Sequence, residues 1–213
     1  KFQHYPEEVN QLTSLKSLQL QYNDIKVLPA SMTLLVNLRE LSVSHNPLVK
    51  VPQIVSCFTG LRTLWLDNTL LEEIPGFIGK LKNLKVFSGV QNNILSLPDE
   101  LGGMISLTKM NLDSNALRNL PESLGSLTNL QDLSLTRNKI GWLPKSVGML
   151  KKLEDFRIGF NRLRALPGEI GGLSSLVRLR VGNNSLETIP LEIGLLANLE
   201  DLSIHSNQIT LIP

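Results

Sequence analysis

A leucine recurs along this sequence every 23 residues, and that period limits the chain to very few kinds of fold. If each such leucine is position 1 of a unit, the units begin at Leu15, Leu38, Leu61, Leu84, Leu107, Leu130, Leu153, Leu176 and Leu199. Apolar residues recur at positions 4, 6, 11, 14, 18 and 21, and Pro stands at position 15 of every unit. A strict period of this length predicts stacked, similar units that pack against their neighbours.

Positions 3 to 7 of each unit alternate between polar and apolar residues; segment 132–136, for example, reads DLSLT. Alternation with a period of two predicts a half-buried strand. Because every unit supplies one strand in the same direction, we expect a parallel sheet, roughly 40 Å long for nine strands at ~4.8 Å spacing. Side chains at positions 2, 3, 5, 7 and 8 are predicted to face away from the core.

Asn occupies position 9 in every unit except one, where Thr69 replaces it. An Asn side chain can both donate to and accept from the backbone at a buried bend, so we expect a ladder of Asn side chains and a looser third unit. Pro at position 15 begins a return segment, for which the apolar spacing predicts one or two turns of α or 3₁₀ helix. Gly stands at position 19 from Gly79 onward but not in the earlier units, so the earlier turns can differ.

Three positions depart locally from the unit. Gly89 stands where other units have a buried aliphatic residue, and we interpret Phe87, two residues earlier, as filling the space. Pro47, directly after an Asn of the ladder, indicates a turn variant. Cys57 lies at position 20, without a His at a related position, and is interpreted as a packing residue on the convex side.

The unit resembles the leucine-rich repeat family over essentially the whole chain. The form Leu-Pro-x-x-Ile-Gly-x-Leu at 166–173 is similar to its intracellular branch: Ras-pathway scaffold proteins, plant Ras-group relatives and Roco-type GTPases. The resemblance implies a curved, right-handed α/β solenoid with a parallel inner sheet and short helical or 3₁₀ turns outside. We expect a single domain over 1–213, with a partial unit at 1–14 and an incomplete last unit. Neither end carries a polar capping unit, which indicates a segment of a longer chain.

Composition excludes several classes of function. The formal net charge is +2, which argues against a general nucleic-acid or membrane-surface binder. No apolar run reaches the roughly 18–20 residues of a membrane helix. A single cysteine cannot form an internal disulfide, and the family's extracellular members usually carry cysteine-rich caps, so a cytoplasmic location is predicted.

No catalytic constellation is evident. The three His residues are scattered, no Cys/His set has zinc spacing, and no Gly-rich phosphate loop is present. Adjacent carboxylates such as Glu154-Asp155 have no partner that would mark an acid/base pair. We therefore expect no enzyme activity, cofactor or metal within this segment.

The predicted inner face carries residue types that often anchor protein interfaces. We expect two patches: Trp65 near Arg39, Arg62 and Asp67, and a second patch at higher residue numbers. The partner-binding residues are predicted to be Trp65, Arg137, Arg157, Phe160, Arg178 and Arg180. An acidic or phosphorylated protein segment would suit the second patch. The alternative is that its arginines pair with Asp132, Glu154 and Asp155. Trp142, at position 13, is expected on the rim.

By resemblance, the implied function is protein–protein recognition in signalling or scaffolding, through the concave face. One alternative is the recognition domain of a multidomain enzyme (kinase, GTPase, cyclase or ubiquitin ligase) with catalysis elsewhere. Another is an extracellular or immune-type receptor ectodomain, and a third is a structural unit of a large assembly.

Overall fold

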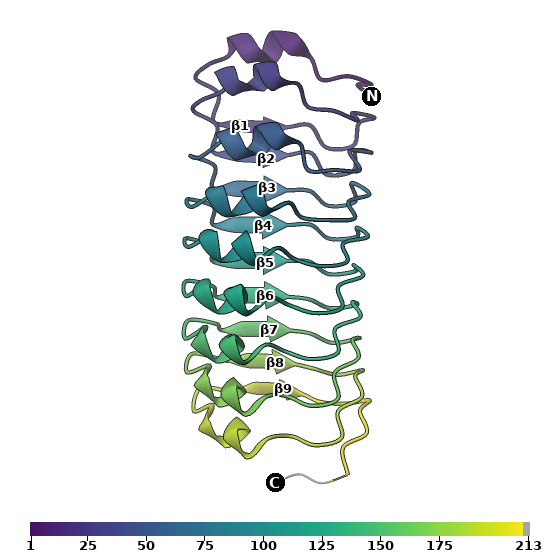
Figure 1. The fold of residues 1–213 in the computed structure, drawn as a ribbon, viewed down its shortest axis with the longest axis vertical. Coiled ribbons are helices and arrows are strands. Elements are labelled where there is room, and N and C mark those ends of the chain that lie inside the picture. The colour runs from purple at the N-terminus through teal and green to yellow at the C-terminus, as the bar shows by residue number, and fades with distance from the viewer. Residues whose placement is uncertain (211–213) are drawn as a thin grey trace.

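In the computed structural model, which describes residues 1–210, the strands form one parallel sheet in chain order (Figure 1). Each strand is three residues long and covers positions 3 to 5 of its unit. The strands are β1 (Ser17–Gln19), β2 (Glu40–Ser42), β3 (Thr63–Trp65), β4 (Val86–Ser88), β5 (Lys109–Asn111), β6 (Asp132–Ser134), β7 (Asp155–Arg157), β8 (Arg178–Arg180) and β9 (Asp201–Ser203). The register never slips: Leu18 pairs with Leu41, and each later pair is offset by the same period.

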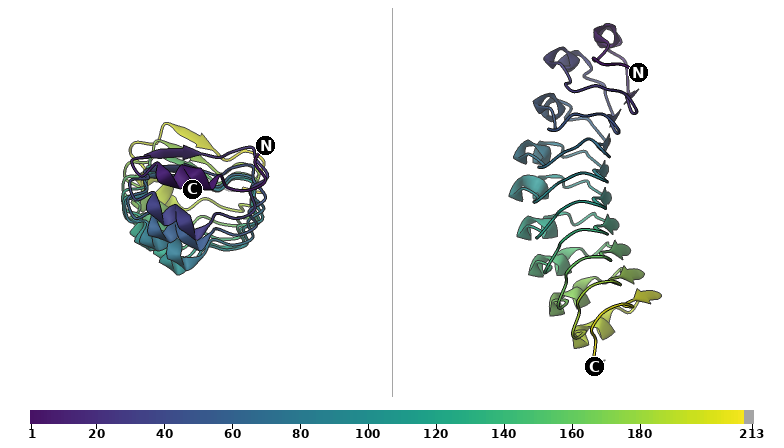
Figure 2. Two further views of the ribbon diagram at one scale, coloured as in Figure 1. Left: turned by 90° about the horizontal axis from the view of Figure 1, so that it is seen from above. Right: turned by 90° about the vertical axis from the view of Figure 1, so that its right-hand side faces the viewer.

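A five-residue 3₁₀ helix follows Pro in every described return segment. The helices are η1 (Glu7–Gln11), η2 (Ala30–Leu34), η3 (Gln53–Cys57), η4 (Gly76–Lys80), η5 (Asp99–Gly103), η6 (Glu122–Ser126), η7 (Lys145–Met149), η8 (Gly168–Gly172) and η9 (Leu191–Leu195). Seen from the side, the coils stack into an arc with the strands on its inner surface and the helices outside (Figure 2). The predicted parallel inner sheet with convex 3₁₀ turns is confirmed. Pro213, the last predicted repeat proline, lies outside the described residues.

The aliphatic side chains form one continuous core between sheet and helices. Leu133 and Leu135 are both completely buried. Each helix adds an apolar residue at position 18, such as Ile78 and Val147, which are also completely buried. Since each coil covers the apolar face of the next, stability is shared along the stack.

The predicted Asn ladder follows the turn after each strand. Asn138, for example, donates from Nδ2 to the carbonyls of Leu112 and Leu135 at 2.9 and 3.1 Å, and Leu117 N donates to Asn138 Oδ1 at 3.0 Å. One side chain thus satisfies three backbone groups of two neighbouring coils.

The irregularity at Thr69 affects its own coil, where Leu70 takes a left-handed φ of 63°, and also the coil before it. Thr69 is fully buried and donates from Oγ1 to Leu66 O at 2.7 Å, which replaces one bond of an Asn. Its side chain offers no acceptor to the coil before it, where Leu48 N donates to Asn46 O instead, Val49 N donates to Thr69 O at 2.9 Å and Val49 takes a left-handed φ of 64°. The turn variant predicted at Pro47 is this segment.

Gly at position 19 allows adjacent helices to approach closely. A Cβ built on Gly79 would lie 2.1 Å from Glu100 O, and one on Gly148 would lie 2.4 Å from Glu169 O. All nine helices of residues 1–210 have the same length, so the earlier coils differ in spacing and not in turn type. Helices η4 to η9 pack closer to their neighbours than η1 to η4.

Two local interpretations need correction. The space at Gly89 is filled, but the atoms nearest to a built Cβ belong to Leu112 and Ile94, at 3.2 and 3.6 Å, and not to Phe87. Cys57 is exposed and is not a packing residue, because the last residue of η3 turns outward. Among residues 1–210, the model has no helix of the length and apolarity that a membrane crossing requires.

Candidate functional site

A hollow of about 230 Å³ lies on the inner face, over strands β3 to β7. Trp65 and Arg157 stand at its two ends. Its floor is made by the small position-5 residues of the strands between them: Ser88, Asn111 and Ser134. Val86, Lys109 and Asp132, at position 3, line one side. Three strands with short side chains between two large ones leave a trough open to solvent.

Trp65 stands above its surroundings because its strand neighbours are small. In the sheet it pairs with Ser42 of β2 and Ser88 of β4, both of which are buried. The indole ring is therefore half-buried against the sheet, with its remaining surface turned toward solvent. A rigid aromatic ring held in this way is a typical anchor for a partner side chain.

Two aspartates behind the floor fix its hydroxyl groups. Ser88 Oγ donates to Asp67 at 2.5 Å, and Ser134 Oγ donates to Asp113 at 2.7 Å. The same carboxylates accept backbone N–H groups of the following coils, from Val90 at 2.8 Å and from Thr136 at 2.7 Å. The floor is thus preorganised, and little ordering is needed when a ligand binds.

The arginines at the other end of the face form an ion-pair network with aspartates. Arg157 Nη2 lies 2.6 Å from Asp132, Arg178 Nε lies 2.9 Å from Asp155, and Arg180 Nη2 lies 2.8 Å from Asp201. Asp155 also lies 3.4 Å from Arg157 and 3.6 Å from Arg180. Three guanidinium groups thus meet three carboxylates, and the formal charge of the cluster is balanced.

The ion-pair network changes the pKa values of its arginine side chains. Burial alone would lower the pKa of Arg157, but the hydrogen bond to Asp132 and the charges of Asp132 and Asp155 outweigh it and raise that pKa. The hydrogen bond to Asp155 raises the pKa of Arg178. Both side chains are therefore held charged and in fixed orientations.

Arg137 and Phe160 lie apart from this network, at position 8, where the chain leaves the sheet. The Arg137 guanidinium stacks over the Phe160 ring, 5.4 Å from its centroid. Both residues have left-handed backbone angles, with φ of 59° and 55°. Every described unit has a non-glycine residue in this conformation at position 8, including Tyr22 and His45, whose rings stack at 4.2 Å.

The structure therefore groups the predicted residues differently from the two patches expected. Trp65 and Arg157 line the same hollow, and Arg157, Arg178 and Arg180 share one network. Arg39 and Arg62 line a separate groove of about 280 Å³ with Lys85. The expected alternative pairing is found for Asp132 and Asp155, whereas Asp201 takes the place that was considered for Glu154.

Sequence reasoning considered Asp132 and Asp155 as arginine partners but missed Asp201 and the two aspartates at position 7, Asp67 and Asp113. Their signal was an Asp one coil before or after the Arg or Ser that it contacts. Within residues 1–210, no three His, Cys, Asp or Glu side chains gather closely enough to hold a metal ion.

Comparisons with known proteins agree with this architecture. A family model described as "Leucine-rich repeat region" matches residues 122–211, and another described as "Leucine Rich Repeat" matches residues 37–58. The fold is that of a leucine-rich repeat protein. No curated protein sequence matches the chain.

Solved leucine-rich repeat structures superpose over nearly the whole chain. A leucine-rich repeat protein of Leptospira interrogans has a TM-score of 0.79 at 32% identity, covering 99% of this chain and 60% of that one. An internalin of Listeria monocytogenes has a TM-score of 0.84 at 25% identity, covering 97% and 59%. The ectodomain of the plant receptor kinase GASSHO1/SCHENGEN3 from Arabidopsis thaliana, in complex with CASPARIAN STRIP INTEGRITY FACTOR 2, has a TM-score of 0.71 at 26% identity, covering 97% and 29%. The chain spans about three fifths of the length of the first two proteins.

Proposed function

We propose that this leucine-rich repeat segment is a protein-interaction module that binds an extended partner segment on its inner face, in the hollow between Trp65 and Arg157. The observation that carries the proposal is the hollow itself, with an aromatic ring at one end, a charged network at the other and a fixed polar floor. Its volume of about 230 Å³ suits one or two partner side chains. Pockets for whole small molecules are roughly 300–1,000 Å³.

The network gives the partner a second point of contact. Arg157, Arg178 and Arg180 keep 36–41% of their side-chain surface exposed, so outer N–H groups remain available. The acidic or phosphorylated segment that the sequence favours here would have to share these arginines with Asp132, Asp155 and Asp201. We therefore propose Trp65 as the main anchor and the arginines as groups that orient the partner.

A signalling or scaffolding role in the cytoplasm, in the manner of the intracellular branch of the family, is part of this proposal. The exposed thiol of Cys57 supports a reducing compartment, and it is the chain's single cysteine. A second candidate is a receptor ectodomain, which is favoured by the likeness to a plant receptor kinase in complex with a partner factor. Determining where the tagged full-length protein resides would separate the two.

The hollow can be tested by filling it without removing Trp65. Peptides would be selected from a random twelve-residue display library against the chain, and their affinities measured for Asn111→Trp, which inserts a large ring at the floor. We expect at least a tenfold loss of affinity for Asn111→Trp and for Trp65→Ala. Ser203→Trp is the matched control, because it occupies the same position in β9, outside the hollow. Equal affinity of Asn111→Trp and the parent chain would contradict the proposal.

A further inference from the structure

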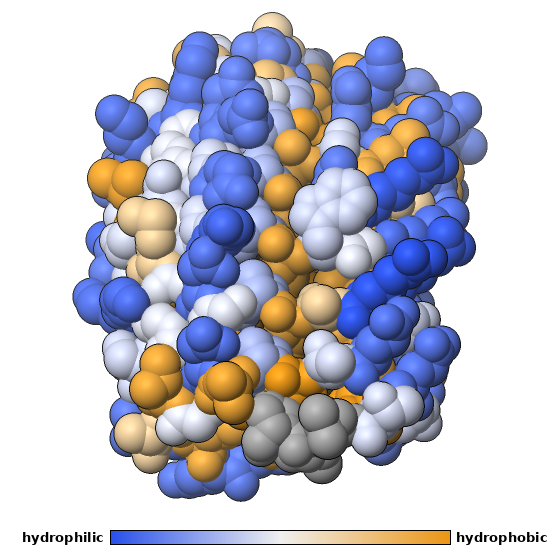
Figure 3. All heavy atoms as spheres, turned by 60° about the horizontal axis from the view of Figure 1, so that its bottom comes forward, coloured by the Kyte–Doolittle hydropathy of each residue, from blue (hydrophilic) through white to orange (hydrophobic). Residues whose placement is uncertain are grey.

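A second surface of unusual chemistry lies on the loop edge, at positions 8 to 13 of three successive units. It consists of Arg118, Arg137, Lys139, Trp142, Phe160, Arg162 and Arg164, all exposed. We call it the Trp142 rim. Figure 3 shows hydrophilic side chains gathered along this right-hand edge of the molecule, beside a lengthwise strip of hydrophobic atoms. The inner-face hollow includes none of these residues.

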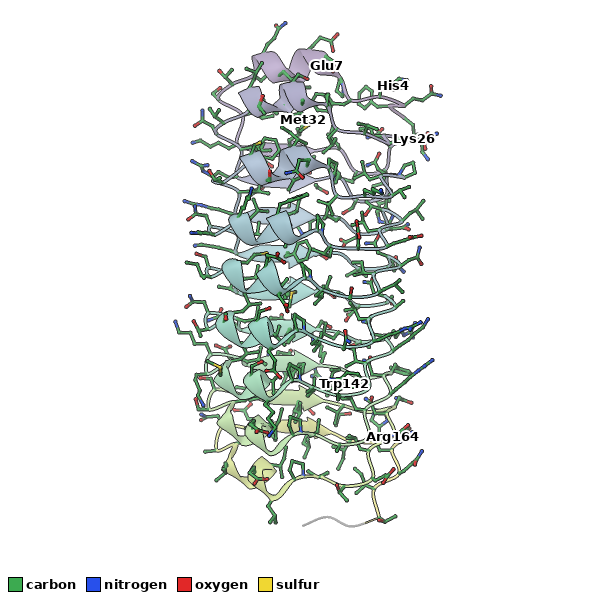
Figure 4. The ribbon with its side chains drawn as sticks, viewed as in Figure 1. His4, Glu7, Lys26, Met32, Trp142 and Arg164 are labelled. Carbon is green, nitrogen blue, oxygen red and sulfur yellow. The ribbon has the colours of Figure 1, made fainter. Side chains whose placement is uncertain are left out.

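Trp142 is the centre of the rim. The residue is 60% exposed, and it is the more exposed of the chain's two tryptophans. Its counterparts in the adjacent coils, Asn119 and Ala165, are too small to cover it. Figure 4 shows Trp142 and Arg164 on the same loop side of neighbouring coils. Nothing in the packing of the stack requires a tryptophan at this place.

The five cations of the rim have no anionic partner. The ion pairs within residues 1–210 involve Arg157, Arg178, Arg180 and Lys145, and none of the rim residues. The nearest acid in the same column of positions is Glu187, one coil beyond Arg164, and its side chain forms no ion pair. The rim is therefore a site of uncompensated positive charge on a chain whose formal net charge is only +2.

Arg137 and Phe160 stand at position 8, where every described unit has a left-handed φ. Asn, Asp and Gly adopt such angles more readily than bulky residues. The chain nevertheless also places Tyr22, His45 and Gln91 there, so the backbone angle is a property of the repeat. What the pair adds to the rim is a guanidinium held over an aromatic ring, 5.4 Å from its centroid.

We propose that the Trp142 rim binds an acidic segment of a partner protein, in which Asp or Glu side chains flank an apolar one. Arg118 and Arg164 are two coils apart, about 10 Å at the strand spacing, and Trp142 belongs to the coil between them. In an extended chain alternate side chains share one face, so residues i, i+2 and i+4 face the rim over ~13 Å, a span that the long arginine side chains can meet. An apolar side chain at i+2 would pack on the indole ring while carboxylates at i and i+4 meet the two arginines.

The rim suits a protein segment better than a nucleic acid. Single-stranded nucleic acids bind where successive aromatic rings offer stacking platforms along a basic groove. Here Arg137 already stacks over the Phe160 ring, so Trp142, which is 60% exposed, is the more open of the two rings.

Tryptophan fluorescence can report on the rim alone, because the chain has only two tryptophans. In a Trp65→Phe chain, Trp142 is the sole fluorophore. The probe is a synthetic twelve-residue peptide of Asp and Glu around one central Leu. We expect a saturable change in Trp142 emission, with an affinity that falls as salt is raised. The same peptide with Asn and Gln in place of its acids should bind at least tenfold more weakly.

Charge reversal provides the decisive comparison. Arg118→Glu with Arg164→Glu should weaken peptide binding at least tenfold, and Lys26→Glu with Lys50→Glu should change it less than twofold. The control pair lies at positions 12 and 13 of the first two full units, on the same edge and far from Trp142. Unchanged thermal melting of all variants would exclude unfolding as the cause.

Three results would overturn the proposal. They are equal binding of the neutral peptide, equal loss in the two charge-reversed pairs, and tighter binding of a twelve-residue oligothymidylate than of the acidic peptide. The inner-face hollow is tested separately, since its library peptides are expected to respond to Asn111→Trp and not to the rim substitutions.

Discussion

The guanidinium of Arg157 donates from Nη2 to Asp132 Oδ1 over 2.6 Å, between neighbouring strands of the sheet. This bond is the first step of a chain of alternating charges that continues through Asp155 to Arg180. Because Asp155 lies between arginines of two adjacent coils and each arginine of the network has a carboxylate partner, the inner face at β6 to β9 is rigid and nearly neutral. The polarity of that face is thus part of the scaffold as well as a surface for partners.

Asp155 is the central carboxylate of this network, and its loss should be costly. The residue is 8% exposed and lies within 4.0 Å of three arginines. Asp155→Ala leaves those charges without their shared partner, and we expect a loss of about 2–4 kcal/mol in the free energy of unfolding. Asp201→Ala removes a carboxylate that is 45% exposed and has one partner, so it should cost less than about 1 kcal/mol. Urea denaturation compares the two, and equal losses would argue against the central role of Asp155.

Gly79 is required by the close packing of helices, and a methyl group there should be destabilising. Its built Cβ lies 2.1 Å from the backbone oxygen of Glu100, which cannot move without shifting η5. We expect Gly79→Ala to lower the free energy of unfolding by about 1–3 kcal/mol. Gly194→Ala is the control: it has the same position in its unit, and no atom lies within 4 Å of its built Cβ. That substitution should be neutral or stabilising by up to about 1 kcal/mol in the same urea experiment. If both alanines behaved alike, helix spacing would not explain the glycine.

The Asn ladder predicts that removing a single side-chain amide lowers the free energy of unfolding. Asn138→Ala would leave the bonds to Leu112, Leu135 and Leu117 unmade, and their backbone groups are buried. We expect a loss of roughly 2–4 kcal/mol in unfolding free energy, measured by urea denaturation. Asn129→Ala is a milder comparison, because Asn129 donates an exposed bond to Ile105 O at 2.9 Å. It should cost less than about 1 kcal/mol, and a similar cost for both variants would contradict the ladder's structural role.

Tyr5 links stability to alkaline pH. Burial and, secondarily, the charge of Glu7 raise the pKa of Tyr5 from 10.0 to about 12, and its hydroxyl donates to Asn10 Oδ1 at 2.8 Å. The folded state therefore holds the proton more tightly than the unfolded state. The resulting stability is complete below pH 10 and is lost as the pH rises through about 12.

Tyr5→Phe should be less stable than the parent at neutral pH, but its stability should fall less between pH 9.5 and 11.5 (about the range between the two pKa values). Absorbance at 295 nm should also show that the titration at about pH 12, which belongs to Tyr5, disappears in Tyr5→Phe. Tyr22→Phe is the control, because that side chain is 64% exposed. Parallel pH profiles for Tyr5→Phe and the parent would contradict the prediction.

The period of 23 residues was sufficient to predict the sheet, the Asn ladder and the buried leucines, because each is set by contacts between equivalent positions. The sequence placed the irregularity in the unit of Thr69, where Leu70 takes a left-handed φ, but it could not show that Leu48 and Val49 would be affected too, since the missing side-chain acceptor serves the coil before. It also placed Cys57 in the packing, because a period gives the face of a residue only approximately at a helix end.

Trp65 and Arg157 were identified singly, but not as the two ends of one hollow. That relationship depends on the short side chains of Ser88, Asn111 and Ser134. Short polar side chains of this kind do not stand out in a sequence. The pairing of each arginine was likewise undecided, because rotamers and not spacing determine whether Asp201 or Glu154 is reached. The exposure of Trp142 was expected on the rim, but its unpaired cationic neighbours are apparent only when the coils are stacked.

The unbroken register between coils also has an evolutionary consequence. Duplication of one whole coil between β3 and β7 would preserve every strand pair and every Asn bond, whereas loss of a single codon would displace all later coils from their partners. Each such duplication would move Trp65 and Arg157 apart by ~4.8 Å. The number of coils could therefore adjust the length of the binding surface to partner segments of different length, while the hydrophobic core stays unchanged.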